Sequence, residues 1–154
     1  MKSKITKVMS KKLVVVPMGT CLMEAQKIMT EKRIRHLPVV DEMDDVVGIL
    51  SQRDLANGTS SLKIPVELLM SSPLHYVPWD LPLKSAILKM LELKISSLLV
   101  ADEDENAIGI VTTDDLLWHL SNLLSDETEE KTLLSPSSRK FIGEFSNKLA
   151  QMGI

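Results

Sequence analysis

The chain has 154 residues, of which 44% are hydrophobic, 25% charged and 3% aromatic, and its formal net charge is −3 at pH 7. A chain of this size buries enough apolar surface to fold without disulfides, and its single cysteine excludes a disulfide framework. Mild acidity and scarce aromatic residues argue against a nucleic-acid binder, and no apolar run approaches the ~20 residues of a membrane-spanning helix. We therefore expect a cytoplasmic protein whose partners include neither nucleic acid nor membrane.

The sequence contains an internal repeat with an offset of 61 residues. Residues 8–55 align with residues 69–116 without a gap, and 18 of the 48 aligned positions are identical. Such self-similarity predicts two copies of one structural unit. We predict a first repeat over residues 1–61, a second over residues 62–124 and a C-terminal extension over residues 125–154.

The first half of each copy has the pattern of a strand followed by a helix. After short helical lead-ins at residues 5–9 and 65–70, an apolar run ends at a proline, which predicts strands over residues 13–16 and 74–77. Asp80 is the predicted N-cap of the helix in the second copy. In both copies, apolar residues then recur at i, i+3 and i+7, the pattern of a helix with one buried face. They are Leu22, Ala25 and Met29 in the first copy and Leu83, Ala86 and Met90 in the second.

The second half of each copy has the pattern of a hairpin followed by another helix. In the first copy, the apolar runs 37–40 and 46–50 flank a polar turn, and a helix begins at residues 51–55. The predicted unit is therefore β-α-β-β-α. The fold class is α/β (α+β), with two tandem units and a C-terminal helical extension.

The C-terminal extension begins as a continuation of the last helix through residues 116–124, followed by an acidic connector over residues 125–130. Apolar residues at i, i+4, i+8 and i+11 predict a further amphipathic helix over residues 137–152. They are Phe141, Phe145, Leu149 and Met152. This helix either packs on its own module or a twin subunit, or it docks a separate effector protein.

A hydroxyl and a carboxylate three positions apart follow the last strand of each copy. They are Ser51 and Asp54 in the first copy, and Thr112 and Asp115 in the second. A helix N-terminus favours phosphate, the hydroxyl can donate to a phosphate oxygen, and the carboxylate can accept the hydroxyls of a ribose. The alternative is structural, because the same pair forms a capping box for the first N–H groups of a helix. Both interpretations can hold in one protein.

Both copies resemble cystathionine-β-synthase (CBS) domains, and the whole resembles a tandem CBS pair. The resemblance rests on residues 34–41 (IRHLPVVD) and 48–55 (GILSQRDL), which recur as residues 95–102 (ISSLLVAD) and 109–116 (GIVTTDDL). It departs from the family pattern at Leu99, where proline is usual. The resemblance implies repeats related by pseudo-two-fold symmetry and a homodimer that covers exposed leucines such as Leu88, Leu91 and Leu117. It also implies a regulatory ligand such as ATP, ADP, AMP, S-adenosylmethionine or a cyclic dinucleotide.

The resemblance further implies that each copy holds adenine between strands and ribose and phosphate at the Ser/Thr-x-x-Asp motif. In the first copy the implied site consists of Val15, Val16, Arg35, His36, Pro38, Ser51, Arg53 and Asp54. In the second copy it consists of Tyr76, Val77, Ser96, Ser97, Leu99, Thr112, Asp114 and Asp115. For most of the valines, ordinary core packing is the alternative.

The two implied sites differ in charge. Arg35, His36 and Arg53 of the first copy align with Ser96, Ser97 and Asp114 of the second. We predict that the first site prefers a di- or triphosphate, whereas the second takes a monophosphate or an uncharged adenosyl group, or stays empty. If the side chains of Arg53 and Asp114 point into solvent, both sites should bind phosphate equally.

The sequence carries no signature of a catalytic or metal site. Cys21 has no catalytic motif around it, and no His, Cys or carboxylate set has ligand spacing. We therefore expect no enzymatic activity, no cofactor and no metal. The leading interpretation is a stand-alone module that senses an adenine-containing ligand and signals its occupancy to a partner. The alternative is an interaction module with degenerate sites, and an enzyme comes third.

Overall fold

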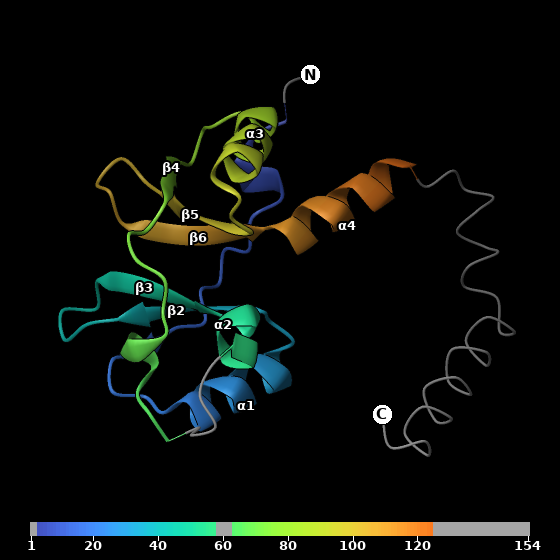
Figure 1. Ribbon diagram of the computed structural model, residues 1–154. Helices are drawn as coiled ribbons and strands as arrows, with labels where there is room; N and C mark the ends of the chain where they lie inside the picture. The colour runs from blue at the N-terminus through green and yellow to red at the C-terminus, as the bar shows by residue number, and fades with distance from the viewer. Residues whose placement is uncertain (1–2, 58–62, 125–154) are drawn as a thin grey trace, which may run out of the picture. The chain divides into compact units, whose positions relative to one another are not determined.

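The computed structural model describes residues 3–57 and 63–124, which form two repeats (Figure 1). The first repeat contains η1 (Ile5–Lys7), β1 (Val16–Pro17), α1 (Leu22–Lys32), β2 (His36–Val40), β3 (Val46–Ser51) and α2 (Gln52–Asn57). The second contains η2 (Val66–Leu68), β4 (Tyr76–Pro78), α3 (Leu83–Leu93), β5 (Ser97–Ala101), β6 (Ala107–Thr112) and α4 (Thr113–Leu124). The predicted helix with the apolar residues Phe141, Phe145, Leu149 and Met152 lies outside the described residues.

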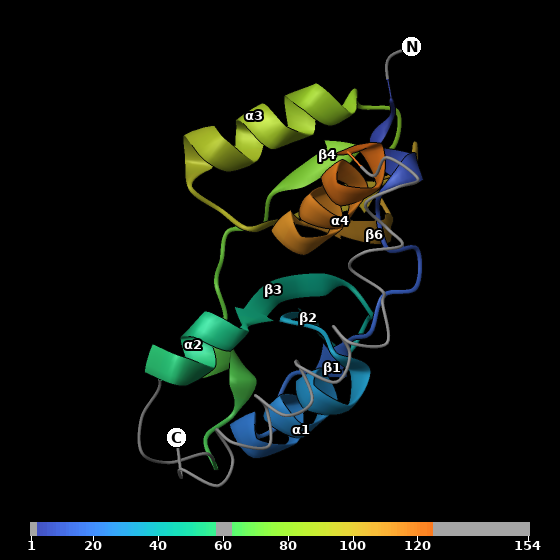
Figure 2. The ribbon, with the colours of Figure 1, turned by 90° about the vertical axis from the view of Figure 1, so that its right-hand side faces the viewer.

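Each repeat forms a three-stranded sheet. The strand orders are β1-β2-β3 and β4-β5-β6, and in both sheets the first pair is parallel and the second antiparallel. The register repeats as well, since Val39 lies opposite Gly48 and Val100 opposite Gly109. The element order confirms the predicted β-α-β-β-α unit and the mixed α/β class. Figure 2 shows the layers in the order α3, the β4–β6 sheet, the β1–β3 sheet and α1.

The first helix of each repeat buries the predicted apolar face. Both helices end at a residue in the left-handed conformation, Arg33 after α1 and Lys94 after α3, each with φ of 54°. That conformation closes the last helical turn, because the N–H of each of these residues bonds back to carbonyl groups of the helix. The buried residues are Leu22, Ala25 and Met29 in α1 and Leu83, Ala86 and Met90 in α3.

Two local predictions were wrong. Asp80 is not an N-cap, because Pro82 has an extended backbone and α3 begins only after it. The strands predicted over residues 13–16 and 74–77 are shifted towards the C-terminus, because pairing with β2 begins at Val16, opposite Val39. Pro17 belongs to β1, which tolerates a residue without an N–H group because it is an edge strand.

The lead-in segment of each repeat packs in the core of the other repeat. Ile5 is fully buried in the core of the second repeat, and Val66 is fully buried in the core of the first. Main-chain hydrogen bonds fix both segments: the Ile5 N–H donates to the Leu81 carbonyl over 3.0 Å, and the Val66 N–H donates to the Thr20 carbonyl over 2.9 Å. In Figure 1 the blue N-terminal turn accordingly lies beside α3. The two sequence repeats are therefore not separate packing units.

The lead-in segments also explain the glycines of β3 and β6. Met9 lies over Gly109, and a Cβ atom there would lie 2.9 Å from both the Met9 Sδ and the Ser10 carbonyl oxygen. Met70 occupies the equivalent position over Gly48. A glycine at each position therefore leaves room for the methionine of the other repeat's lead-in segment, and at Gly109 also for the main chain at Ser10.

The two sheets contact each other through a small apolar cluster. Ile49, Leu99 and Ile110 form its buried part, and Leu74 and Tyr76 pack against it. This cluster joins the two repeats and leaves polar residues at the ends of the strands on either side.

Among the described residues, none of the helices has the length and apolar composition to cross a membrane.

Candidate functional site

Both hydroxyl–carboxylate pairs form capping boxes. The Ser51 N–H and Oγ–H donate to Asp54 Oδ2 over 2.6 and 2.7 Å, and the Asp54 N–H donates back to Ser51 Oγ over 3.3 Å. Thr112 and Asp115 repeat the pattern at 2.8, 2.7 and 3.3 Å. The structural interpretation therefore holds in both copies. The box uses only one carboxylate oxygen, and within the described residues Asp54 Oδ1 has no hydrogen bond, so it is available to a ligand hydroxyl.

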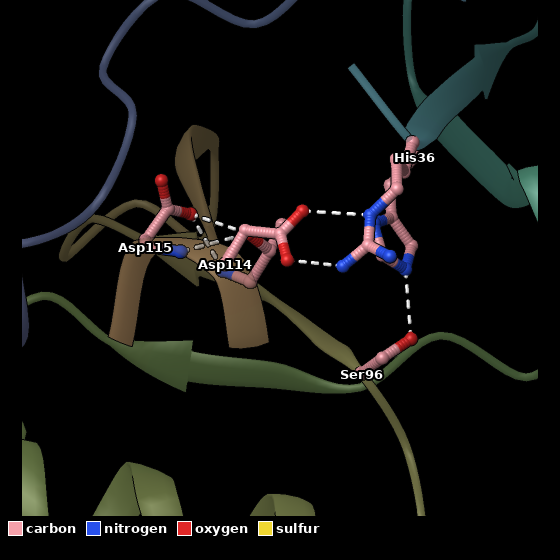
Figure 3. A network of polar contacts seen from close by, with 6 residues as sticks. His36, Ser96, Asp114 and Asp115 are labelled. Atoms are coloured by element: carbon pink, nitrogen blue, oxygen red, sulfur yellow. Dashed lines mark hydrogen bonds and ion pairs between the residues drawn. The ribbon is translucent and has the colours of Figure 1, made fainter. Parts of the chain in front are cut away.

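A second polar network joins the two copies (Figure 3). The Arg35 guanidinium pairs with both carboxylate oxygens of Asp114, with 2.7 Å between Nε and Oδ2. Beside it, His36 Nε2 and Ser96 Oγ are 2.8 Å apart. Residues that sequence alignment assigns to two different sites are thus in direct contact.

His36 is the titratable group of this network with a shifted pKa, and its side chain is partly buried. Its Nδ1 is buried and has no hydrogen-bond partner among the described residues. Burial, and to a lesser degree the positive charge of Arg35, lower the pKa of His36 below its ordinary value. Three carboxylates act in the opposite direction without cancelling this effect; they are Asp114, Asp54 and Asp115. The imidazole is therefore neutral at pH 7.

This lowered pKa predicts a pH-dependent stability. As the pH falls below about 6.5, the unfolded chain takes up a proton on His36 before the folded chain does. The contribution of neutral His36 is fully present above that pH and is lost as the pH falls towards the lowered pKa. We expect the thermal unfolding midpoint of the parent to drop more steeply below pH 6.5 than that of His36→Gln, measured by circular dichroism. His119→Gln is the control and should follow the parent, and parallel curves for all three proteins would contradict the prediction.

A cavity of about 720 Å³ opens beside the Ser51–Asp54 box. Its lining includes predicted residues of both copies, namely Arg35, His36, Ser51, Arg53 and Asp54 from the first and Ser96 and Ser97 from the second. It also includes residues that the sequence did not indicate: the apolar Ile49, Pro73, Leu74 and Ile95, and the basic or polar Gln52, Ser71, His75 and Lys94. The pseudo-two-fold symmetry that the resemblance implies could have indicated these residues, because a cavity between two related sheets takes one wall from each.

The other predicted site residues do not lie in this cavity. Val16, Pro38, Val77 and Leu99 are buried in the core, so ordinary packing explains them. Val15, Tyr76 and Val77 line a second cavity, of about 1050 Å³, which shares no lining residue with the first. The predicted adenine slot around Val15, Val16 and Pro38 is thus not formed next to Ser51 and Asp54. The reason is that β1 pairs along β2 far from the end of β3 where the box lies, with Val16 opposite Val39.

The second cavity has the wrong charge for a phosphate. Its lining includes no basic side chain and five carboxylates, which are Asp44, Asp45, Asp102, Glu103 and Glu105. Burial, with Asp45 as the smaller cause, also raises the pKa of Tyr76. A phosphorylated ligand should therefore avoid this cavity.

The charge difference predicted between the two sites needs correction. Arg35 and Asp114 were assigned to opposite sites, but the ion pair neutralises both. The first cavity keeps a positive balance for another reason: Arg53 and Lys94 line it and have no ion pair within residues 3–57 and 63–124. An anionic ligand is thus still favoured there.

The sequence matches the model of the CBS domain family over residues 5–59 and again over residues 66–122. The chain belongs to the CBS domain family. Its CBS pair is similar to that of protein MJ0100, solved in complex with 5′-methylthioadenosine and S-adenosyl-L-methionine, with 29% identity and a TM-score of 0.73 over 79% of this chain and 98% of that one. It is also similar to the cytosolic domain of the Mg²⁺ channel MgtE in complex with ATP, with 27% identity and a TM-score of 0.64 over 77% and 49% of the two chains.

The chain is also similar to part of a curated enzyme. L-aspartate semialdehyde sulfurtransferase of Methanocaldococcus jannaschii is 34% identical over 119 residues, which are 75% of this chain and 23% of that protein. The chain thus spans about a quarter of the length of this relative. The similarity covers the part of this chain that forms the CBS pair and does not extend over the rest of the sulfurtransferase.

Proposed function

We propose that this CBS pair is a regulatory module that binds one adenine-containing ligand in the cavity beside Ser51 and Asp54 and signals its occupancy to a partner protein. The cavity carries the proposal because it combines three surfaces that such a ligand needs. Ile49 and Leu74 offer an apolar wall for adenine, Asp54 offers a free carboxylate oxygen for ribose, and Arg53 offers a positive charge for phosphate. Its volume of about 720 Å³ suits a ligand of nucleotide size.

The comparisons support this proposal through ligand chemistry. The CBS pair of protein MJ0100 was solved with two adenosyl compounds and the cytosolic domain of MgtE with ATP, so adenosine is the moiety common to these complexes. A carboxylate for ribose and an apolar wall for adenine serve all of these compounds equally.

The proposal is tested by calorimetric titration of the parent protein with ATP, ADP, AMP, S-adenosyl-L-methionine, 5′-methylthioadenosine and a cyclic dinucleotide. We expect at least one of them to bind with about one ligand per chain and to raise the thermal unfolding midpoint, because a ligand that binds only the folded state stabilises it. The absence of both heat and thermal shift for every compound would overturn the proposal.

A second candidate function is an interaction module, and the exposed leucines of α3 favour it. Leu88 and Leu91 are 53% and 69% exposed, whereas Ala86 and Met90 of the same helix are buried. A helix with apolar residues on both faces needs a partner. The family resemblance favours a second copy of the chain as this partner. Ligand sensing and dimerisation would then occur in one protein.

Light scattering should therefore give a mass of about twice 17.2 kDa for the parent at tens of micromolar. Replacing Leu88 and Leu91 together by lysine should shift the mass to that of the monomer, since like charges would meet across the interface. Met43→Lys is the matched control, because Met43 is 82% exposed in a hairpin turn. A monomeric parent would contradict the dimer.

A further inference from the structure

Arg35 stands between the two capping boxes. Its carbonyl oxygen accepts the N–H of Gln52 over 2.9 Å, which fixes its main chain next to Ser51 of the first box. Its guanidinium reaches Asp114, the residue before Asp115 of the second box. Arg35 also lines the cavity beside the first box, so one side chain is within reach of both an internal carboxylate and a ligand in that cavity.

The ion pair with Asp114 is weak enough to be exchanged. The side chains of Arg35 and Asp114 are each 52% exposed, and exposed ion pairs contribute little net stability because water solvates both charges. A guanidinium makes the same forked contact with a phosphate as with a carboxylate. A ligand phosphate in the cavity therefore offers Arg35 an equivalent partner with more negative charge, whereas an uncharged adenosyl group offers none.

An ion pair of this kind is present at Arg35 but not at the position equivalent to it in the second repeat. The positions equivalent to Arg35 and Asp114 are Ser96 and Arg53, which hold no negative charge. Ser96 is instead within hydrogen-bond distance of His36, and Arg53 has no ion-pair partner in the described part of the chain. Any competition between ligand and protein is therefore confined to Arg35.

We propose that Arg35 determines ligand specificity in this cavity and that Asp114 is its internal competitor. Arg35 leaves Asp114 for the phosphate of an adenine nucleotide, and the ion pair between the two repeats opens as the phosphate binds. An uncharged adenosyl ligand leaves the ion pair in place. The cavity thus selects phosphorylated ligands, and only these break the ion pair between the repeats. This inference rests on the proposed binding of an adenine-containing ligand.

Calorimetric titrations with ATP and with 5′-methylthioadenosine at low ionic strength test the inference. Asp114→Asn should tighten ATP binding roughly three- to tenfold, because Arg35 no longer has to leave a carboxylate, and should change the affinity for 5′-methylthioadenosine less than about twofold. Arg35→Gln should weaken ATP binding about tenfold and should affect 5′-methylthioadenosine much less. In the double variant, most of the gain from Asp114→Asn should disappear, which identifies the coupling between the two residues.

Asp104→Asn is the matched control, because it makes the same change of charge at an exposed position in the turn between β5 and β6. It should leave the affinity for both ligands unchanged, and thermal melts verify that every variant is folded. If both ligands bind the parent and Asp114→Asn affects them equally or not at all, the inference is overturned and the proposed function stands. If 5′-methylthioadenosine binds the parent and ATP does not, the inference is likewise overturned and the proposed function stands. If none of the six compounds titrated above binds the parent, the proposed function fails, and the inference fails with it.

Discussion

Ile5→Ala is expected to lower the free energy of unfolding by about 2–5 kcal/mol, and to do so by loosening the second repeat. Ile5 is fully buried and packs with Val77, Ala86 and Leu98, none of which belongs to its own repeat. Its removal leaves a cavity that the surrounding side chains fill only in part. Chemical denaturation measures the total loss, and hydrogen exchange should show that amides of β5 and β6 lose more protection than those of β2 and β3.

Val66→Ala provides the complementary measurement, because Val66 is buried in the core of the first repeat. It should reduce protection mainly in β2 and β3. Leu68→Ala is the matched control on the same η2 turn, since Leu68 is 66% exposed, and it should change stability by less than about 0.5 kcal/mol. If Ile5→Ala mainly affected its own repeat, the crossed packing would be wrong.

Asp54→Ala is expected to weaken ligand binding roughly ten- to a hundredfold. A hydrogen bond to a charged group contributes about 1.5–3 kcal/mol, and Asp54 is the carboxylate that borders the cavity. The substitution also removes the capping box and should cost about 0.5–2 kcal/mol of stability, which leaves the protein folded. Calorimetry measures the first effect and chemical denaturation the second.

Asp115→Ala separates the two roles of the carboxylate. Asp115 makes the same hydrogen bonds in the second box, so its loss should cost the same stability, but it does not line the cavity and the affinity should be kept. If Asp54→Ala bound ligand as tightly as the parent, the carboxylate would have a structural role alone. If Asp115→Ala lost one of two binding equivalents, the second box would hold a ligand as well, as the sequence predicts.

The features that could be predicted from the sequence are local ones. The buried face of α1, the hairpin of β2 and β3, and the box of Ser51 and Asp54 each depend on residues a few positions apart. Periodicity and spacing report such relations directly. Because both copies show the same patterns in the same order, the repeat supported the predicted order of the strands and helices twice.

The features that could not be predicted depend on which copy a residue contacts. Alignment of the copies places Arg35 and Asp114 in separate sites, and only the packing of the two sheets shows that they meet. The role of Leu74 could not be predicted either. Its apolar side chain packs against the cluster between the sheets and also lines the cavity, and the sequence does not distinguish these two positions. Val16 was predicted to line a ligand site but lies in the core. The sequence pattern of a strand valine is the same in both situations.

The crossed lead-ins also constrain the order in which the protein can fold during synthesis. The β1–β3 sheet is complete at Ser51, but its core lacks Val66 until η2 has been made, which takes roughly 1–4 s at ribosomal rates of about 5–20 residues per second. Ile5 is buried later still, because its partners in β5 and β6 are synthesised near the end of the second repeat. The nascent first repeat thus exposes part of its apolar core until η2 emerges from the ribosome, so a ribosome-bound fragment in which Val66 has not emerged should recruit chaperones more strongly than one in which η2 has emerged.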